Sequence, residues 1–460
     1  MEIKEFLTNK FKDIFHRDPS YFAFAPGRTN LIGEHLDYNN CPVFPFAIDL
    51  RISACFSVRD DNVIRIVDAD GIHGERIFEA DNVIPPFSGG DWGNYPKAAV
   101  QGIISDGKIT VPYRGFDAVI YSTVPAAGGM SSSSAFVVLV SLIFSTANGI
   151  SYSKMELSAL TAVAERYVGT QGGGMDQTAS INGIAGKVLK IGFSPLSCTP
   201  YPVPEGYSFV VADTLIKARK SKEALFYFNS KPIECRLAVA VLRKKLPPCL
   251  KKPLTVNFLG DLSPENTGLT EAEIDRAVFS VLKETGYTYG EIAEILETDV
   301  ETVQKSFCLM ADGTPLPQPE NGFALSARTR HVLTEWRRVE QCASAMEKGD
   351  AETVGRLMYE SHVSCRDNGD FSCSELNALV EAARKAGAVG SRMTGAGRGG
   401  CTVSLVRNGD VDSFISRIHH DYYDNYLNQT HPEIPEESKR NAAFVVRPSD
   451  GASVFSLNVE

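Results

Sequence analysis

Four residues of types that could serve a small-molecule site lie within ten positions of one another near the N-terminus, in the segment GRTNLIGEHLDYN (27–39). They are Arg28, Glu34, His35 and Asp37. Charged side chains in a rigid loop can pair with the hydroxyl groups of a small polar molecule, because a buried group without a partner costs about 1–3 kcal/mol. A metal site is disfavoured because the one histidine has no second ligand at a typical spacing. The remaining alternative is a solvated polar loop in which the aspartate caps a helix.

A second candidate is a run of small residues, VPAAGGMSSSSAF (124–136), which leads into an apolar segment expected to form a helix. Gly128 and Gly129 would let backbone N–H groups approach an anion, and a helix N-terminus favours negative charge. One serine suffices for a helix cap, so four hydroxyl groups in a row indicate a site for phosphate or Mg²⁺. They belong to Ser131, Ser132, Ser133 and Ser134. The lysine of a Walker A loop and the H-R-D and D-F-G motifs of protein kinases are absent from the sequence, so a different phosphate loop is predicted.

A third candidate is Asp176, which follows three glycines in GTQGGGMDQTAS (169–180). The preceding segment, 152–169, has the pattern of an amphipathic helix, so the glycines place the aspartate on a turn at its end. A lone aspartate is most often a helix cap or a solvated side chain. Here the glycine run would allow close approach of a ligand, which makes the carboxylate a candidate proton acceptor.

A second glycine cluster, TGAGRGGCTVSL (394–405), contains the spacing G-x-G-x-x-G at Gly395, Gly397 and Gly400. A dinucleotide-binding motif of this type must follow a strand and begin a helix. The residues that follow here, CTVSLV, predict a strand instead. We therefore expect a closely packed turn near the phosphate loop rather than a dinucleotide site.

The elements that must position these residues form two halves, each of which mixes helices and strands. A chain of 460 residues exceeds the size at which one core usually keeps growing, which predicts two domains. Strand-like alternation dominates 21–67, whereas helical patterns become more frequent after residue 214. We place the N-terminal domain at 1–205 and the C-terminal domain at 206–460, with two strands at the C-terminal end.

Composition and charge disfavour several classes of partner. The formal net charge is −10 and the pI about 5.5, which argues against binding to nucleic acid or to an anionic membrane surface. No apolar run reaches the length of a membrane span, and the ten scattered cysteines fit a reduced cytosol. The segment 286–307 has the pattern of a helix-turn-helix. Its second helix carries Asp299 and Glu301, whose negative charges disfavour contact with DNA phosphates, so we expect the segment to pack within the protein. The expected form is a cytoplasmic monomer without nucleic-acid or membrane partners.

Taken together, these segments resemble the galactokinase branch of the GHMP kinases, which includes N-acetylgalactosamine kinases. GRTNLIGEHLDYN is similar to the sugar-binding motif of that branch, and PAAGGMSSSSA to the phosphate loop of the whole superfamily. SRMTGAGRGGCTVSL resembles the C-terminal glycine motif, and WGNY, GGGMDQ and IECRLA extend the resemblance over nearly the whole chain. The resemblance implies an α+β, two-domain GHMP kinase fold with mixed sheets and helices and the active site in the cleft between the domains. It also implies a helical insertion at about 255–322 and the use of ATP and Mg²⁺.

The resemblance also implies roles for individual residues. Arg28 and Asp176 would act on the reacting hydroxyl group, with the aspartate accepting its proton and the guanidinium favouring the charged carboxylate. The residues that would contact or flank the rest of the sugar are Glu34, His35, Asp37, Gly173 and Phe228. Those that would contact the nucleotide phosphates are Gly128, Gly129, Ser131, Ser132, Ser133 and Ser134. Ser133 and Glu165 would hold Mg²⁺.

Two positions depart from the pattern of the branch. Phe228 stands where relatives carry a tyrosine near the sugar, which removes one hydroxyl group and leaves the preference at C2 of the sugar open. Arg398 stands where relatives usually carry an aromatic residue. The predicted function is ATP-dependent transfer of a phosphoryl group to the anomeric hydroxyl of galactose. The alternatives are an N-acetylgalactosamine 1-kinase and a catalytically silent relative that senses the sugar.

Overall fold

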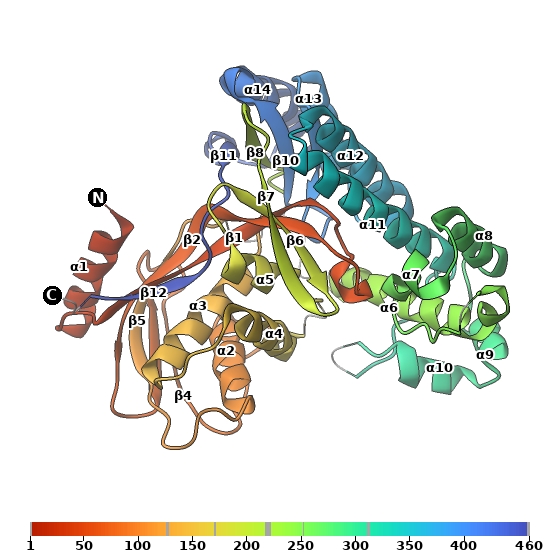
Figure 1. Cartoon of the computed structure of the whole chain (residues 1–460). Helices are drawn as coiled ribbons and strands as arrows, with labels where there is room; N and C mark the ends of the chain where they lie inside the picture. The colour runs from red at the N-terminus through yellow and green to blue at the C-terminus, as the bar shows by residue number, and fades with distance from the viewer. Residues whose placement is uncertain are drawn as a thin grey trace.

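Runs of strands and runs of helices follow one another along the described chain, and the strands build two larger β-sheets and one two-stranded hairpin (Figure 1). The computed structural model describes residues 2–125, 128–169, 172–216, 222–251, 253–310 and 313–457, apart from the side chains of 222–225 and 228. The predicted mixture of α and β structure in both halves is therefore present.

The first sheet has six strands in the order β12-β1-β2-β5-β3-β4. These are β1 (Tyr21–Ile32), β2 (Phe44–Val58), β3 (Val63–Asp68), β4 (Glu75–Glu79), β5 (Phe116–Ser122) and β12 (Ser453–Ser456). All neighbours are antiparallel except β3 and β5. Along β1, Ala23 and Ala25 belong to the main core whereas Phe22 and Phe24 belong to a smaller cluster on the other face, as the two-residue period of a strand requires.

Helices cover both faces of this sheet. α1 (Ile3–Phe15) packs on β2 and β5 and joins the cluster of Phe22 and Phe24. On the other face, α3 (Ser132–Ala147) and α5 (Met175–Asn182) contact β1 and β2. α2 (Asn94–Ser105) and α4 (Lys154–Ala164) pack outside them. α3 is apolar nearly all round because it lies between the sheet and this outer layer.

The second sheet has four antiparallel strands in the order β11-β8-β10-β9. These are β8 (Tyr207–Asp213), β9 (Gly390–Thr394), β10 (Cys401–Arg407) and β11 (Ala443–Val446). Its helices are α12 (Ala351–Ser364), α13 (Ser374–Lys385) and α14 (Val411–Ile418). The hairpin of β6 (Lys187–Phe193) and β7 (Leu196–Pro202) precedes β8, and β6 contacts β2 of the first sheet.

A group of helices extends from the second sheet, at the right of Figure 1. It contains α6 (Lys222–Lys245), α7 (Pro264–Thr267), α8 (Glu271–Val281), α9 (Tyr289–Leu296), α10 (Val300–Phe307) and α11 (Leu325–Glu347). Capping side chains explain where several of them begin: Thr270 and Thr288 form capping boxes, and Asp299 accepts from the N–H of Thr302 at 2.8 Å. α9 and α10, the two helices expected in 286–307, both contact α6. None of the described helices is long and apolar enough to cross a membrane.

Short or irregular helical segments complete the described chain. They are Asp37–Asn39, Glu165–Val168, Pro247–Cys249, Leu259–Asp261, Cys365–Gly369, Asn408–Asp410, His419–Leu427, α15 (Asn428–Thr430) and α16 (Glu436–Lys439). Asp37–Asn39 and Glu165–Val168 matter for the site, because each carries a carboxylate that the sequence singled out.

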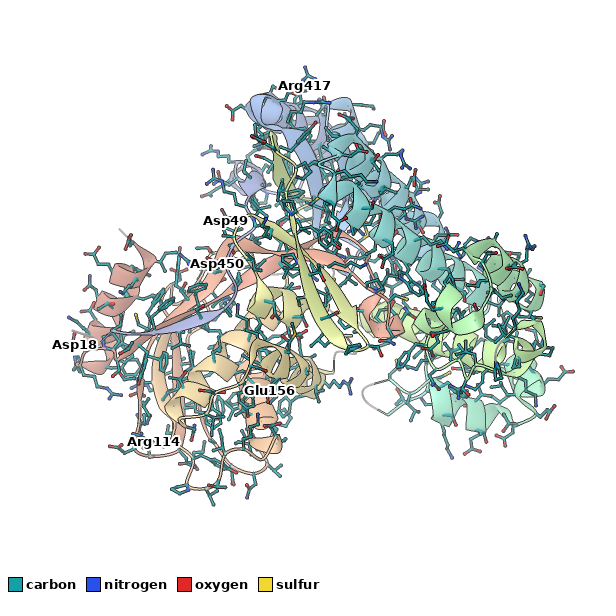
Figure 2. All side chains as sticks on the ribbon, viewed as in Figure 1. Asp18, Asp49, Arg114, Glu156, Arg417 and Asp450 are labelled. Carbon is teal, nitrogen blue, oxygen red and sulfur yellow. The ribbon has the colours of Figure 1, made fainter. Side chains whose placement is uncertain are left out.

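The C-terminal end of the chain joins both sheets. Two strands form there, as expected, but β11 pairs with β8 and β12 pairs with β1 rather than with each other. The crossing segment is held by Asp49, which accepts from the N–H of Arg447, and by Asp450, which accepts from the N–H of Ala185, both at 3.0 Å. Figure 2 shows Asp49 and Asp450 where the chain passes from one sheet to the other. A division at residue 205 therefore leaves one strand of the first sheet in the C-terminal part.

Candidate active site

Arg28 and Asp176 meet at the junction of β1 and α5. Arg28 Nε donates to Asp176 Oδ1 at 2.7 Å, and Arg28 Nη1 donates to the backbone oxygen of Gly129 at 2.6 Å. Asp176 lies in the first turn of α5, directly after a turn in which Gly174 has a φ of +104°, a backbone conformation that favours glycine. The Arg28 side chain is 6% exposed and that of Asp176 is 26% exposed. The carboxylate is therefore the member of the pair that a small molecule can reach.

The phosphate loop joins this pair. Ser131 Oγ donates to Asp176 Oδ2 at 2.5 Å, and the N–H of Arg28 donates to the backbone oxygen of Met130 at 3.1 Å. Because its hydroxyl group is used in this way, Ser131 makes no side-chain cap at the start of α3. The first N–H groups of a helix have no partner within the helix, and without that cap they suit an anion.

The two glycine segments pack against each other, as the sequence predicted. A Cβ atom at Gly395 would lie 2.8 Å from the oxygen of Gly129, and one at Gly129 would lie 3.0 Å from the oxygen of Thr394. Larger residues would push the phosphate loop away from the turn. The turn connects the antiparallel strands β9 and β10, so the expectation of a packed turn, and not a dinucleotide motif, is confirmed.

Glu165 lies behind the phosphate loop, at the C-terminal end of α4. Its carboxylate accepts hydrogen bonds from Ser134 at 2.8 Å and from Gln177, and Ser133 also reaches it. Burial, aided by the negative charge of Asp176, raises the pKa of Glu165 from its ordinary value of 4.5 to about 7. In the described part of the chain, no group of three or more His, Cys, Asp or Glu residues is arranged to hold a metal ion.

The predicted sugar motif spans the end of β1 and the turn that follows. Gly33 has a φ of +95° and His35 a φ of +62°, so the backbone bends sharply on both sides of Glu34. The Glu34 side chain is buried. Its carboxylate accepts from three protein groups, which are Arg392 Nη1 at 2.7 Å, Asn30 Nδ2 at 3.0 Å and the N–H of Gly395 at 3.0 Å. These donors occupy most of the lone pairs that the sequence assigned to a sugar hydroxyl.

His35 lies between two aromatic rings. Its ring stacks on Phe371 with 3.6 Å between ring centroids, and its Nδ1 is 3.2 Å from the hydroxyl group of Tyr38. Burial, with the charges of His331 and Lys231, lowers the pKa of His35 well below 6.5. The imidazole is therefore neutral at pH 7 and has both a donor and an acceptor nitrogen.

Asp37 is held by the backbone of the glycine run before Asp176. Its Oδ2 accepts from the N–H of Gly173 at 2.9 Å and from the N–H of Met175 at 3.4 Å. A Cβ atom at Gly173 would lie 2.3 Å from the carbonyl carbon of Asp37, so a larger residue would separate the two segments. Burial and the charge of Asp176 raise the pKa of Asp37 to about 6. The charge of Asp176 thus acts on both Asp37 and Glu165.

A cavity of about 800 Å³ opens beside Asp37 and Gly173. It lies between α4, the β6–β7 hairpin and α6, and its lining includes Tyr38, Ala162, Phe193, Pro232 and Arg236. Phe228, which the sequence placed near the sugar, lies one turn before Pro232 on α6. Its side chain is outside the described part of the chain.

Arg398 connects the glycine turn to α6. Its φ is +59°, and its guanidinium carbon lies 4.0 Å from the centre of the Tyr227 ring. Its Nη2 lies 3.5 Å from the Asp370 carboxylate, which also binds Lys231 Nζ at 2.6 Å and lies 3.7 Å from Arg328. Tyr227 and Lys231 lie on α6, whereas Arg328, Asp370 and Arg398 come from three other parts of the C-terminal half. No local sequence motif indicates that these residues lie together, so their association is visible only in the folded structure.

Three family models match separate parts of the chain. The galactokinase galactose-binding signature matches residues 9–58, the GHMP kinases N terminal domain matches residues 94–183, and the GHMP kinases C terminal model matches residues 342–425. The first match contains the motif from Arg28 to Asp37, the second contains the phosphate loop, and the third contains the glycine turn.

Several known proteins are similar to the chain over nearly their whole length. Galactokinase of Dictyostelium discoideum is 33% identical, with 99% of this chain and 94% of the relative covered. Galactokinase of Roseiflexus sp. (strain RS-1) is also 33% identical, with 97% and 95% covered. A crystal structure of Lactococcus lactis galactokinase with galactose superposes with a TM-score of 0.77 at 25% identity, covering 98% of this chain and 100% of the other.

Proposed function

The chain belongs to the galactokinase family of GHMP kinases, and we propose that it transfers the γ-phosphoryl group of ATP to the anomeric hydroxyl of galactose. The α+β, two-domain GHMP kinase fold predicted from the sequence is confirmed. The observation that carries the proposal is the meeting of Arg28, Asp176 and Ser131 beside the galactose-binding motif. The products would be galactose 1-phosphate and ADP.

In this reaction Asp176 takes the proton of the reacting hydroxyl group. Its Oδ1 stays with Arg28, and a sugar hydroxyl shares or replaces the contact of Oδ2 with Ser131. The sugar oxygen forms a bond to the γ-phosphorus, the bond from that phosphorus to the β–γ bridging oxygen breaks, and ADP leaves. Arg28 offsets negative charge beside the transferring group. Proton transfer to a positioned base contributes ~10²–10⁴ in rate.

We assign the nucleotide phosphates to the loop before α3. The proposed contacts are the backbone of Gly128 and Gly129 and the hydroxyl or N–H groups of Ser131, Ser132 and Ser133. The uncapped start of α3 and the φ of +73° at Gly129 support this assignment. Ser134 was expected to join this set, but it is buried and gives its hydroxyl group to Glu165, so we assign it to holding that carboxylate.

Glu165 and Ser133 fit a Mg²⁺ site. A buried carboxylate whose pKa is raised to about 7 gains from a nearby cation, and Mg²⁺ commonly takes one or two protein oxygens together with phosphate and water oxygens. When bound, the ion would neutralise charge on the phosphate oxygens. Ser134 and Gln177 would keep the Glu165 carboxylate oriented towards it.

We assign recognition of the remaining sugar hydroxyl groups to Asp37, His35 and the backbone of Gly173, with Phe228 flanking the sugar. Neutral His35 and the ionised form of Asp37 offer complementary donors and acceptors at pH 7. Glu34 contributes through the one lone pair that its three protein donors leave.

An N-acetylgalactosamine 1-kinase is the second candidate. One observation favours it: a cavity of about 800 Å³ adjoins Asp37 and Gly173, two of the residues assigned to the sugar, and would give space to a substituent that extends from the sugar on that side. The side chain at position 228 would also bear on this choice.

A sugar panel tests the proposal. Purified protein with ATP and Mg²⁺ is given galactose, N-acetylgalactosamine, galacturonate, arabinose or mevalonate, and ADP release is followed. We expect the highest kcat/KM with galactose. Turnover of mevalonate and of no sugar would contradict the proposal. Thermal stabilisation by galactose without ADP release would identify a sugar sensor instead.

We also propose that the protein acts as a cytoplasmic monomer whose domains divide near residue 205. All ten cysteines are free of disulfides, which suits a reducing compartment. Size-exclusion chromatography with light scattering should give 50.1 kDa, and a mass of twice that value would contradict the monomer.

A further inference from the structure

A fully buried arginine of the second sheet reaches into the sugar motif. Arg392 lies on β9 and has no exposed surface. Its Nη1 donates to Glu34 Oε2 at 2.7 Å and to the backbone oxygen of Asn30 at 3.0 Å. Its Nε donates to Ser361 Oγ on α12 at 3.1 Å. A guanidinium without access to water needs such partners, and two of them belong to the segment between Arg28 and Asp37.

A buried glutamate holds the same segment from α11. Glu335 Oε1 accepts from the N–H of Gly33 at 2.9 Å and from Ser361 Oγ at 2.5 Å, while Oε2 accepts from Arg338 Nε at 2.7 Å. Burial alone would raise the pKa of Glu335, but the charges of Arg338 and Arg392 prevail and hold it at about 2. The carboxylate is therefore ionised at every pH at which the enzyme would work, and its hold on the Gly33 N–H does not change.

A neutral histidine completes the set. His331 on α11 lies with Nε2 3.0 Å from the backbone oxygen of Glu34 and with Nδ1 3.0 Å from Ser364 Oγ. Burial lowers the pKa of His331 to about 4, so the ring is neutral at pH 7. Since a carbonyl oxygen only accepts, the proton lies on Nε2 and Nδ1 accepts from the serine.

These contacts act on the stretch of the motif that bends most. Gly33 and His35 both have positive φ, and the N–H of Gly33 and the backbone oxygen and carboxylate of Glu34 are each bound by a buried group from the C-terminal half. Arg392 and Glu335 share the hydroxyl group of Ser361, so they form one connected network. Within the described chain, their hydrogen bonds go to residues other than Arg28, Asp176 and the phosphate loop.

We propose that Arg392 and Glu335 are positioning residues for sugar recognition, which hold Gly33–His35 in the conformation that binds the sugar. The inference rests on the proposed sugar-kinase function. A network that acts on the motif alone should set the affinity for the sugar and leave the affinity for ATP nearly unchanged. A network with a merely structural role would lower stability without separating the two substrates.

The experiment compares KM for galactose and KM for ATP in Arg392→Lys, Arg392→Met and Glu335→Gln. We expect the galactose KM to rise at least ~10-fold in Arg392→Met and Glu335→Gln, because each variant removes a contact that holds Gly33–His35 in place. The ATP KM should stay within about twofold of that of the parent. Arg392→Lys keeps the charge but loses the forked donors, so it should recover part of the galactose affinity.

Asp117→Asn is the matched control. Asp117 is a carboxylate of β5 whose side chain is 5% exposed and paired with Arg17 at 2.5 Å and Arg59 at 2.9 Å, in contact with neither the motif nor the phosphate loop. It should lower the melting temperature and leave both KM values unchanged. If Arg392→Met does not fold, Ser361→Ala removes the hydroxyl group shared by Arg392 and Glu335 and should give the same selective rise in galactose KM.

Two results would overturn the inference: unchanged galactose KM in folded Glu335→Gln and Ser361→Ala, or an equal rise in both KM values. Galactose turnover by the parent protein shows whether the inference or the proposed function has failed. Absence of galactose turnover by the parent would count against the function, and the comparison of KM values would then use whichever acceptor the panel identifies.

Discussion

Two arginine–carboxylate contacts of equal length have different surroundings in this protein. The Arg28–Asp176 and Arg392–Glu34 pairs both have an N–O distance of 2.7 Å. The Asp176 side chain is 26% exposed, whereas those of Glu34 and Arg392 are 3% and 0% exposed. A carboxylate open on one side can exchange a hydrogen bond with a ligand. A buried pair keeps its partners, because an uncompensated buried charge is costly. The comparison separates a group suited to reaction from a group suited to positioning.

Both pairs depend on the same strand. Arg28 lies within β1, and Glu34 lies just beyond the end of that strand at Ile32. The partner of Arg28 comes from α5 on the first sheet, whereas the partner of Glu34 comes from β9 on the second. The strand and the turn that follows it therefore each supply a residue to one pair, and the sugar motif lies where the two halves of the chain meet.

The largest expected effect comes from Asp176→Asn. The amide oxygen can still accept a hydrogen bond, but it cannot take the proton of the sugar hydroxyl, so kcat should fall by ~10²–10⁴. The melting temperature should stay close to that of the parent, because the side chain is partly solvated. Asp60→Asn, at a fully exposed carboxylate paired with Arg114, is the control and should leave kcat unchanged. Turnover by Asp176→Asn within tenfold of the parent would remove the aspartate from the catalytic set.

The second prediction sets the two arginines against each other. Arg392→Met leaves Glu34 buried without its ion partner and should lower the free energy of unfolding by about 3–5 kcal/mol. Arg28→Met leaves a carboxylate that water can reach, so its cost in stability should be on the order of 1 kcal/mol. Its kcat should nevertheless fall by roughly 10²–10³, because a donor beside the transferring group is lost. Urea unfolding and ADP release measure the two effects, and equal destabilisation by both variants would contradict the comparison.

The sequence pointed to Arg28, Asp176 and Ser131, which the structure brings together, but not to the buried network around Glu34. Arg28, Asp176 and Ser131 each stand in a local pattern of glycines and small residues, and patterns of this kind reveal where a chain must approach a ligand. The contact between Gly129 and Gly395 followed from the same reasoning. Arg392, Glu335 and His331 lie in ordinary strand and helix sequence more than 290 residues from the groups they hold, as the separations of 358, 302 and 297 residues show. Only the tertiary fold brings them to the motif.

The strand order shows the same limit. Alternation along the chain predicted strands at both ends of it, but strand pairing depends on which edge is free after the rest has folded. β12 therefore joins β1 and not its sequence neighbour β11. Glu34 illustrates the limit at a single residue, since its type and position suggested a sugar contact while its lone pairs are used mainly by Arg392, Asn30 and Gly395.

The third prediction concerns pH and the two buried carboxyl groups near Asp176, the partly exposed carboxylate of the Arg28–Asp176 pair. Burial, aided by the charge of Asp176, raises the pKa of Glu165 to about 7 and that of Asp37 to about 6. Raised carboxyl pKa values favour the protonated form in the folded protein, so this contribution to stability is present at low pH and is lost as pH rises through 6–7. Mg²⁺ binds the ionised form of Glu165. As pH rises towards the pKa of Glu165, the apparent KM for Mg²⁺ should therefore fall by roughly tenfold per pH unit, and above that pKa it should level off.

Initial rates at several Mg²⁺ concentrations between about pH 5.5 and 8, a range that brackets the Glu165 pKa of about 7, would measure this effect. Glu156→Gln is the control, because Glu156 lies on the solvent side of α4 (Figure 2) and is paired with Lys108 at 3.0 Å. It should leave the profile unchanged, whereas Glu165→Gln should weaken Mg²⁺ binding and remove its pH dependence. A Mg²⁺ requirement that is constant across this range would argue against Glu165 as a ligand.

The smallest expected effect concerns Arg398, which is intermediate between the two pairs. Its side chain is 49% exposed, its contact with Asp370 is 3.5 Å long, and its guanidinium lies over the Tyr227 ring. Arg398→Ala should lower stability by less than about 1 kcal/mol, because half-exposed ion pairs contribute little. It should raise the galactose KM by roughly two- to fivefold, since the stacking that ties the start of α6 to the glycine turn is worth only about 0.5–1 kcal/mol.

Arg398→Phe is the informative companion variant, because it replaces the ion pair by a ring that can still stack on Tyr227. If stacking is what holds α6 in place, Phe should restore the galactose KM while Ala does not. If the ion pair with Asp370 is what matters, Asp370→Asn should reproduce the effect of Arg398→Ala, and Phe should give no recovery. A galactose KM equal to that of the parent in all three variants would show that the half-exposed contact is dispensable, and would leave Arg392 as the arginine on which sugar affinity depends.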